Sequence, residues 1–178
     1  MAHTKPIPKV KLFIGIMYVN ETFFNKAVEI LKQSFGEVED ISESYNFNQF
    51  TDYYNNEMGD GQVKRFIVFR DLIDRDELAN IKHLTNKIED DFAVNGKRLI
   101  NLDPGYLTEH NVVLASAKEQ PHKVSIGMGM FGDVVLVYRS GNYRSYFKTF
   151  ADYKTEFVQK YLLSVRKKYL LQRRSENV

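Results

Sequence analysis

The segment that most constrains the fold is residues 10–18, which is apolar at nearly every position. Its alternate residues share one apolar face, formed by Val10, Leu12, Ile14, Ile16 and Tyr18. Phe13 and Met17 make the opposite face apolar as well. Because successive side chains of a strand point to opposite faces, a strand of this kind must be covered on both. We therefore expect residues 10–18 to form a central strand of a sheet.

The same segment is too short to cross a membrane. Its longest uninterrupted apolar stretch, residues 12–19, has eight residues, whereas a span needs roughly 18 or more. Lys5, Lys9 and Lys11 precede it as in a signal peptide, but no small-residue cleavage site follows. We expect neither a membrane partner nor export. The absence of cysteine is compatible with a reducing, cytoplasmic setting.

Helical spacing of apolar residues predicts three helices, over residues 21–35, 75–94 and 155–173. Asn20 is a capping residue for the first helix, and Gly36 ends it. Asp74 and Glu77 give an Asp-x-x-Glu capping signal for the second. A short helix or lid is also predicted over residues 50–58, with its aromatic residues packed inward.

Runs rich in β-branched and aromatic residues predict the other strands, over residues 38–47, 64–73, 98–102, 112–117, 124–128, 134–139 and 143–147. The first half then has the order βαββαβ of ferredoxin-like folds, followed by a β-meander and the last helix. We expect a single α+β domain over residues 1–178, with a mixed or mostly antiparallel sheet and about three helices. Residues 1–8 are expected to form a flexible tail, and residues 174–178 a frayed end.

The composition fits such a domain. Of its 178 residues, 43% are hydrophobic and 27% charged, which excludes disordered and fibrous classes. The net charge of +2 is too small to indicate a polyanion partner across the whole surface. Basic residues gather near the C-terminus, at Arg166, Lys167, Lys168, Arg173 and Arg174. A run of this kind is usually a solvated helix end that complements the helix dipole.

The segment Asn101-Leu102-Asp103-Pro104-Gly105-Tyr106 holds the strongest candidate site residues. Its proline and glycine predict a type II turn, and Asn101 and Asp103 share a strand face just before that turn. Ligands often bind at strand ends in layered α/β folds. Asp103 is therefore a candidate catalytic residue, with Asn101 and Tyr106 as ligand-binding candidates. The alternative is that Asp103 only accepts hydrogen bonds from its own turn.

This hexapeptide, together with Tyr53-Tyr54-Asn55-Asn56-Glu57-Met58-Gly59, resembles a family of small bacterial proteins known only as a domain of unknown function. Further matching residues are Arg98, Val113-Leu114-Ala115-Ser116, Lys118, His122 and Asp152-Tyr153. The chain departs from the pattern at Lys123, Asp133 and Ala151, where arginine, glutamate and proline are common. The resemblance implies candidate residues, among them Glu57 as a catalytic one, but no reaction. Some members carry an automatic GTP-binding label.

The residues themselves do not support GTP binding. A P-loop GTPase needs Gly-x-x-x-x-Gly-Lys-Ser/Thr to surround the phosphates with backbone amides, and the sequence has none. Asn86-Lys87-Ile88-Glu89 resembles the guanine-reading Asn-Lys-x-Asp tetrapeptide. However, it lies inside a predicted helix, where its second and fourth residues point about 160° apart. Gly127-Met128-Gly129-Met130-Phe131-Gly132 precedes a strand and not a helix, so it is no dinucleotide fingerprint.

Polar residues also border the apolar face of the second predicted helix. Lys82, Asn86 and Glu89 form a stripe along this border. The stripe either lines a cleft, as ligand-binding residues, or is satisfied within the fold as an ion-pair or hydrogen-bond ladder.

His122 extends the apolar face of the predicted strand 124–128 and lies near Lys118. A titratable nitrogen beside a cation makes His122 a catalytic candidate and Lys118 a ligand-binding one. The alternative is a histidine satisfied at a strand edge. An oxygen-preferring cofactor such as Mg²⁺ also stays open, with the possible ligands Glu57, Asp103, His122 and Asp133.

Together these residues predict a protein that binds a small anionic molecule, such as a phosphorylated compound or a nucleotide. Lys82 and Lys118 would neutralise the anion, and His122 would act as acid or base. Asp103 or Glu57 would orient the substrate or an ion. The alternative is an RNA- or protein-binding module that uses the basic C-terminal segment and exposed aromatic residues, for which the candidates are Tyr143 and Tyr146.

Overall fold

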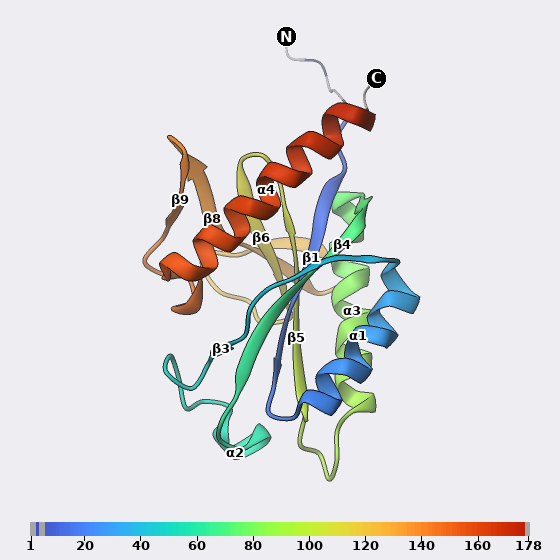
Figure 1. The fold of residues 1–178 in the computed structure, drawn as a ribbon, viewed down its shortest axis with the longest axis vertical. Coiled ribbons are helices and arrows are strands. Elements are labelled where there is room, and N and C mark those ends of the chain that lie inside the picture. Colours follow the sequence, from blue (N-terminus) through green and yellow to red (C-terminus); the bar gives the residue numbers. More distant parts are fainter. Residues whose placement is uncertain (1–2, 4–5, 177–178) are drawn as a thin grey trace.

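Among the described residues, the first strand is the segment expected to be central. In the computed structural model, which describes residue 3 and residues 6–176, β1 (Val10–Tyr18) is buried along its whole length (Figure 1). It lies between β4 (Val63–Ile73) and β5 (Ile100–Leu107) and pairs antiparallel with both. Because packed side chains also cover both faces of β1, the prediction of a central strand is confirmed.

The other strands of the described residues are also paired antiparallel, and they are β2 (Val38–Ile41), β3 (Tyr45–Asn46), β6 (Asn111–Ser116), β7 (Val124–Gly127), β8 (Met130–Arg139) and β9 (Asn142–Ser145). The sheet that these described strands form has the order β2-β4-β1-β5-β6-β8-β7, with β3 beside β4 and β9 beside β8. Its β2-β4-β1-β5 part is the split βαβ arrangement of ferredoxin-like folds. The predicted α+β class with a mostly antiparallel sheet is therefore confirmed.

The first helix, α1 (Glu21–Phe35), follows β1 almost directly. Asn20 caps it, because its Oδ1 accepts a hydrogen bond from Thr22 N at 2.8 Å. Gly36 ends it with a φ of 86°, a left-handed conformation that glycine adopts without steric cost. Both ends agree with the prediction from the sequence.

The second long helix, α3 (Leu78–Asp91), is shorter than the sequence predicts. Asp74 makes no capping hydrogen bond with its side chain, because a 3₁₀ turn (Arg75–Glu77) comes before the helix. Beyond the helix, Val94 and Lys97 pair across a tight turn, which removes these residues from the helix. The predicted strand 38–47 is likewise interrupted and gives β2 and β3.

The expected turn at Asp103-Pro104-Gly105 is absent, and this prediction is wrong. β5 continues through the three residues, with Ile14 of β1 opposite Pro104. β6 pairs with β5 only from Gly105 to Leu107, so at Pro104 one edge of β5 has no strand partner. A proline, which lacks an N–H, is tolerated at such an edge. Pairing with β1 along the whole of β5 outweighs the local preference for a turn.

Gly105 is needed for close packing and not for a turn. A Cβ atom at this position would lie 2.6 Å from Val113 O and 2.8 Å from Phe13 Cζ. Both neighbours belong to buried strands, so we expect Gly105→Ala to lower the free energy of unfolding by about 1–3 kcal/mol. Urea unfolding measures this change, and an unaltered transition midpoint would show that the strands move apart without cost.

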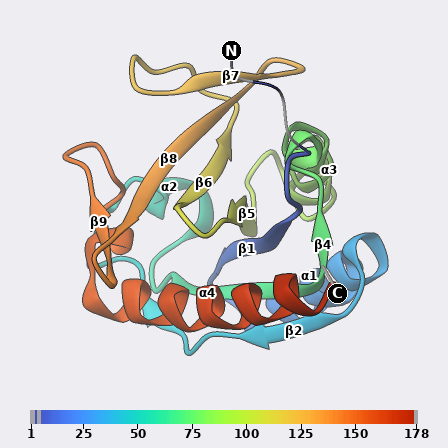
Figure 2. The ribbon, with the colours of Figure 1, turned by 90° about the horizontal axis from the view of Figure 1, so that it is seen from above.

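The two faces of the sheet carry separate cores. α1 and α3 cover one face, where they meet Leu12, Ile14 and Ile16 of β1. The last helix, α4 (Glu156–Glu176), covers the other face with the apolar residues predicted for it, namely Val158, Leu162, Val165 and Tyr169. Figure 2 shows α3 and α4 on opposite sides of β1 and β5, with β8 running from β7 to β9, which lies beside the start of α4.

The short α2 (Asn55–Met58) lies below this sheet in Figure 1 and is the helical part of the predicted segment 50–58. Residues 1, 2, 4 and 5 of the expected tail, and residues 177 and 178 of the expected frayed end, lie outside the described residues. In the described part of the chain, no helix has the length and apolar character to cross a membrane.

Candidate functional site

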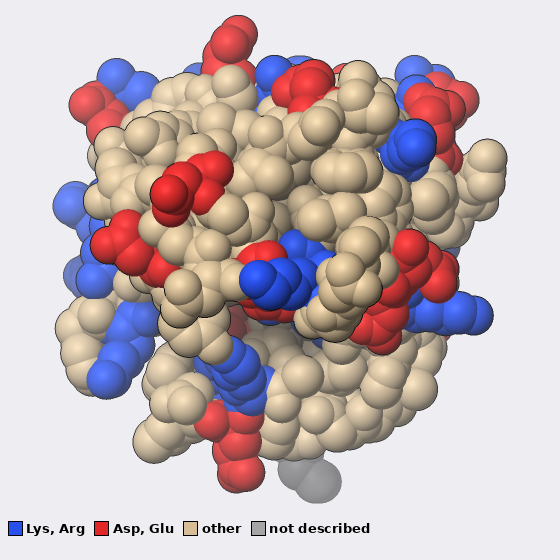
Figure 3. Space-filling model, turned by 90° about the horizontal axis from the view of Figure 1, so that it is seen from below, with Lys and Arg blue, Asp and Glu red and all other residues tan. Residues whose placement is uncertain are grey.

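A cavity of about 690 Å³ lies where β5 and β6 diverge. Its walls come from these strands, from α3 and from segments near residues 47–54, 117–123 and 148–153. Figure 3 shows the molecule from below, with basic and acidic side chains close together around a hollow near the centre. The residues predicted from the sequence that line the cavity are Lys82, Asn86, Glu89, Asn101, Asp103, Lys118 and His122.

Lys82 and Glu89 close the open edge of β5. Lys82 Nζ donates to Leu102 O at 2.8 Å, and Glu89 Oε1 accepts from Leu102 N at 2.5 Å. The two side chains thus replace the strand neighbour that Leu102 lacks on this edge. Burial raises the pKa of Glu89 above its usual value, although Lys82 and the Leu102 N–H favour its charged form. The stripe predicted on this helix therefore serves the fold as well as lining the cavity.

Arg98 joins three segments beside the cavity. Its guanidinium binds both oxygens of Glu57, with Nε at 2.6 Å and Nη2 at 2.8 Å. Its Nη1 donates to Glu89 Oε2 at 3.2 Å and to Asn101 Oδ1 at 3.1 Å. The hydrogen bond from Arg98 lowers the pKa of Glu57, and burial opposes this only partly. Glu57 lies outside the cavity lining and holds α2 against α3 and β5.

Lys64 forms the buried charge centre of the site. Its Nζ lies 2.9 Å from Asp152 Oδ2 and 3.5 Å from Asp103 Oδ2, and its side chain is 4% exposed. Tyr45 Oη also donates to Asp152 Oδ2, at 2.8 Å. Burial alone would lower the pKa of Lys64, but Asp152 and Asp103 outweigh it and raise that pKa. Burial would raise the pKa of Asp103, but the nearby ammonium groups of Lys64 and Lys82 outweigh burial and lower that pKa.

Gly15 makes this centre possible, and sequence reasoning missed it. Gly15 of β1 lies between Phe66 of β4 and Asp103 of β5 in the sheet register. A Cβ atom at Gly15 would lie 2.9 Å from Lys64 Cε. The lysine side chain therefore crosses β1 where no side chain stands, and so reaches Asp103 on the far strand. A glycine within a buried apolar strand was the available signal for this close approach.

One buried hydrogen-bond donor in the cavity wall, Tyr153 Oη, has no partner among the described residues, and the Asn101 amide beside it faces Asp103. Asn101 is 5% exposed and Tyr153 is fully buried. A hydrogen bond from the Asn101 amide helps to lower the pKa of Asp103. Burial, with Asp152 and Asp103 nearby, raises the pKa of Tyr153 well above its usual value of 10.0. Its hydroxyl therefore keeps its proton and can donate.

His122 lies on the opposite wall, beside buried Asp133. His122 Nε2 is 3.6 Å from Asp133 Oδ2, and Lys123 Nζ is 3.8 Å from the same oxygen. Lys123 Nζ also donates to Ser116 Oγ at 2.9 Å. Burial lowers the pKa of Lys123, and Lys118 adds to this effect, against the opposing effect of Asp133. The predicted acid or base is thus next to a carboxylate that can orient its ring.

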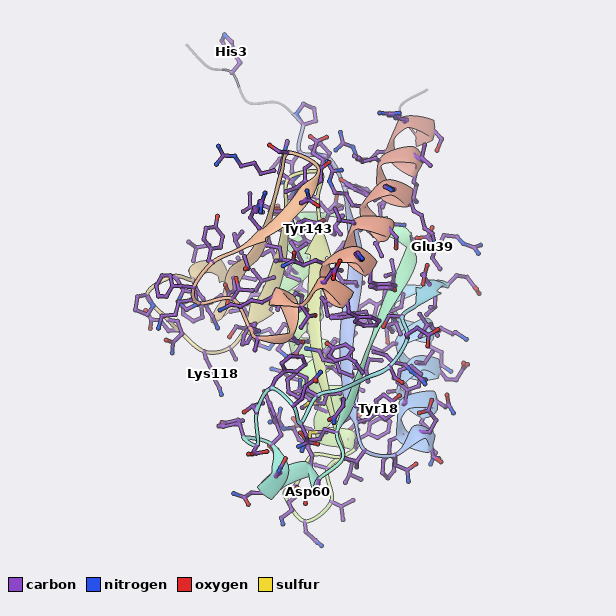
Figure 4. The ribbon with its side chains drawn as sticks, turned by 60° about the vertical axis from the view of Figure 1, so that its left-hand side comes forward. His3, Tyr18, Glu39, Asp60, Lys118 and Tyr143 are labelled. Carbon is purple, nitrogen blue, oxygen red and sulfur yellow. The ribbon has the colours of Figure 1, made fainter. Side chains whose placement is uncertain are left out.

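Two exposed lysines stand at the mouth of the cavity. Lys118 extends from the loop after β6 toward the α2 segment (Figure 4), where its Nζ lies 3.5 Å from Tyr53 Oη. Lys148 Nζ lies 5.4 Å from the centre of the Phe147 ring. Within the described residues, neither lysine has a carboxylate oxygen within 4.0 Å. Their positive charge is therefore left for a ligand or for solvent.

Tyr106 lies apart from the cavity. Its side chain packs with Leu78 and Val113, among the residues of a small separate core. The physical reason is strand alternation, because Asn101 and Asp103 share one face of β5 and Tyr106 lies on the other.

The residues considered as ligands for Mg²⁺ do not meet around one point. Glu57 is bound by Arg98, Asp103 by Lys64, and Asp133 by His122 and Lys123. Within the part of the chain that the structure describes, no three His, Asp or Glu side chains are arranged to hold a metal ion. The ammonium of Lys64 takes the position between two carboxylates that a cation would occupy.

Most of the basic C-terminal residues have partners within the fold. Arg166 donates to Glu109 O at 2.9 Å and lies over the Tyr138 ring. Lys168 pairs with Asp40, and Arg173 with Glu109.

Tyr143, expected to be exposed, is 3% exposed beneath α4 (Figure 4), because it faces the core that α4 covers. Tyr146 is exposed as expected.

Comparison with known proteins places the chain in a family. No curated protein and no solved structure matches it. A family described as a domain of unknown function, DUF4416, matches residues 8–169, a stretch that includes every wall of the cavity. That description agrees with the expected resemblance to a domain of unknown function, and it gives no activity. The chain belongs to the DUF4416 family, a domain of unknown function.

Proposed function

We propose that the cavity binds a small anionic molecule. One observation carries the proposal: a buried donor in its wall, Tyr153 Oη, has no partner among the described residues. A buried donor without an acceptor costs about 1–3 kcal/mol, so an acceptor on a bound molecule would offset this cost. The volume of about 690 Å³ is that of a site for a small molecule.

The charges around the cavity support an anion. The buried acidic groups in the wall are held by cations of the protein, with Asp152 bound to Lys64 and Asp133 beside Lys123. Asp90, which also lines the cavity, is exposed to solvent. Lys118 and Lys148 have no such partner among the described residues and stand where a ligand enters. A charge-assisted hydrogen bond to either lysine would be stronger than one between neutral groups. His122, whose Nε2 lies 3.6 Å from Asp133 Oδ2, is the proposed group for proton transfer.

Thermal unfolding with added ligands tests this proposal. The panel is inorganic phosphate, citrate, GTP, GDP and ATP, each with and without Mg²⁺, together with total tRNA. A ligand at 100 times its Kd stabilises the fold by about 2.7 kcal/mol, so binding raises Tm. We expect at least one anion to raise Tm, and the double variant Lys118→Ala, Lys148→Ala to abolish the rise.

The matched control is Lys160→Ala on α4, where Lys160 is exposed and pairs only with Glu156 among the described residues. This variant should keep the full response to the anion. If no anion raises Tm in the unchanged chain, the cavity is not an anion site. A response to tRNA alone that is lost in salt would favour the nucleic-acid alternative.

A further inference from the structure

The inner part of the cavity differs in charge from its mouth. Asp103 lines the inner part with a side chain that is 34% exposed, whereas Asn101 and Tyr153 beside it are buried. The nearby ammonium of Lys64 is shared between Asp103 and Asp152. A phosphate placed against Asp103 would therefore meet a carboxylate that keeps part of its negative charge. The inner part is unsuited to the anionic group of a ligand.

A hydroxyl group suits the inner part better, because it donates one hydrogen bond and accepts others. It can donate to the Asp103 carboxylate. It can also accept from Tyr153 Oη, a donor that has no partner among the described residues, or from the Asn101 amide that faces Asp103. Since donors and an acceptor lie side by side here, a molecule with several hydroxyl groups satisfies them together.

Aromatic rings complete this inner wall. Phe47, Tyr54 and Tyr153 line the cavity together with Asp103. Burial raises the pKa of Tyr54 to about 12, with Asp103 adding to the effect, so the Tyr54 ring remains neutral. Rings of this kind pack against apolar C–H groups, which a saturated sugar ring presents on its faces.

The mouth of the cavity suits a phosphate. Lys118 and Lys148 are exposed there, and His122 and Lys123 lie on the wall that leads inward. Lysine ammonium groups are common phosphate ligands and act as point charges that need no fixed geometry. The cavity therefore has a hydroxyl-binding inner part and a phosphate-binding mouth.

We infer that the ligand is a sugar phosphate, with its hydroxyl groups toward Asp103, Asn101 and Tyr153 and its phosphate toward Lys118 and Lys148. This inference rests on the proposed function and names the class of molecule that the site accepts. It differs from a nucleotide, which places a base or a phosphate chain in the inner part, and from simple anion binding, which needs only the lysines.

Titration calorimetry on the full chain tests the inference. The probes are glucose 6-phosphate, ribose 5-phosphate and glycerol 3-phosphate, the same compounds without phosphate, inorganic phosphate, ATP and GTP. We expect at least one sugar phosphate to bind about tenfold or more tightly than inorganic phosphate. Asp103→Asn and Tyr153→Phe should each reduce this preference about tenfold. Tyr153→Phe removes a hydroxyl without a described partner, so it should leave the fold intact.

The outcomes separate this inference from the proposed function. If inorganic phosphate binds as tightly as every sugar phosphate, the sugar inference is overturned while anion binding stands. Tighter binding of ATP or GTP than of every sugar phosphate overturns it in favour of a nucleotide. If no phosphorylated probe binds, the sugar-phosphate inference fails, and the proposed function fails as well if citrate also leaves Tm unchanged. Unaltered preference in Asp103→Asn and in Tyr153→Phe would also remove the assigned inner site.

Discussion

Lys64→Met is expected to lower the free energy of unfolding by about 3–5 kcal/mol at pH 7. Lys64 is buried, and its ammonium lies 2.9 Å from Asp152 and 3.5 Å from Asp103. Without it, two carboxylates stay close together in a buried site with no cation between them. Methionine keeps an apolar stem among the Phe66 and Tyr153 rings, so the loss reports the missing charge and not a cavity.

The free energy of unfolding of Lys64→Met should also change with pH, in the direction opposite to the contribution that Asp103 makes in the unchanged chain. In the unchanged chain, burial would raise the pKa of Asp103 above its usual 3.8. Lys64 and Lys82 outweigh this effect and lower that pKa. A carboxyl group of this kind stabilises the fold above about pH 4, and the contribution is lost as the pH falls. Without Lys64, burial raises the pKa of Asp103, so the variant should become more stable as the pH falls from 7 toward about 5.

Urea unfolding at several pH values measures both effects. The control is Lys160→Met, which removes a lysine that is exposed and should leave the midpoint unchanged. Adding Asp152→Asn to Lys64→Met removes one of the two carboxylates and should recover part of the lost stability. If Lys64→Met unfolds at the same urea concentration as the unchanged chain, the buried centre contributes no net stability.

The order of strands and helices was predictable because their signals are local and repeated. The two apolar faces of β1 define its central place, and the spacing from Asn20 to Gly36 defines α1. The error at Pro104 and Gly105 has a physical cause, since turn preferences act within a few residues. Pairing of β5 with β1 involves residues about 90 positions away, and its free energy outweighs those preferences.

The cavity could be predicted only in part. Asn101, Asp103, Lys118 and His122 carry chemistry that stands out in the sequence, and the structure brings them to one cavity. Lys64 does not stand out, because a lysine at the start of a strand is usually exposed. Its position depends on a glycine in a neighbouring strand and on carboxylates from two other segments. Contacts of this kind between distant segments are not visible in one sequence.

Arg98→Met is expected to lower the free energy of unfolding by about 2–3 kcal/mol and to loosen one wall of the cavity. Arg98 is partly exposed, so the loss should be smaller than for Lys64. It would remove the ion pair of Glu89, which is 6% exposed, and leave Lys82 as the nearby cation. It would also remove both hydrogen bonds that hold Glu57 of α2. Hydrogen exchange of residues 47–61 should therefore rise by about tenfold or more relative to β1.

Arg98→Lys distinguishes the effect of the positive charge at this position from that of the bidentate hydrogen bonds to Glu57. A lysine keeps a positive charge near Glu89 but cannot bind both oxygens of Glu57 in the way a guanidinium does. We therefore expect this variant to keep much of the stability while exchange of residues 47–61 still increases. The control is Lys32→Met on α1, where Lys32 pairs with exposed Glu29, and neither measurement should change. Equal exchange in Arg98→Met and in the unchanged chain would mean that α2 is held by other contacts, such as those of Asn55 with Gln62.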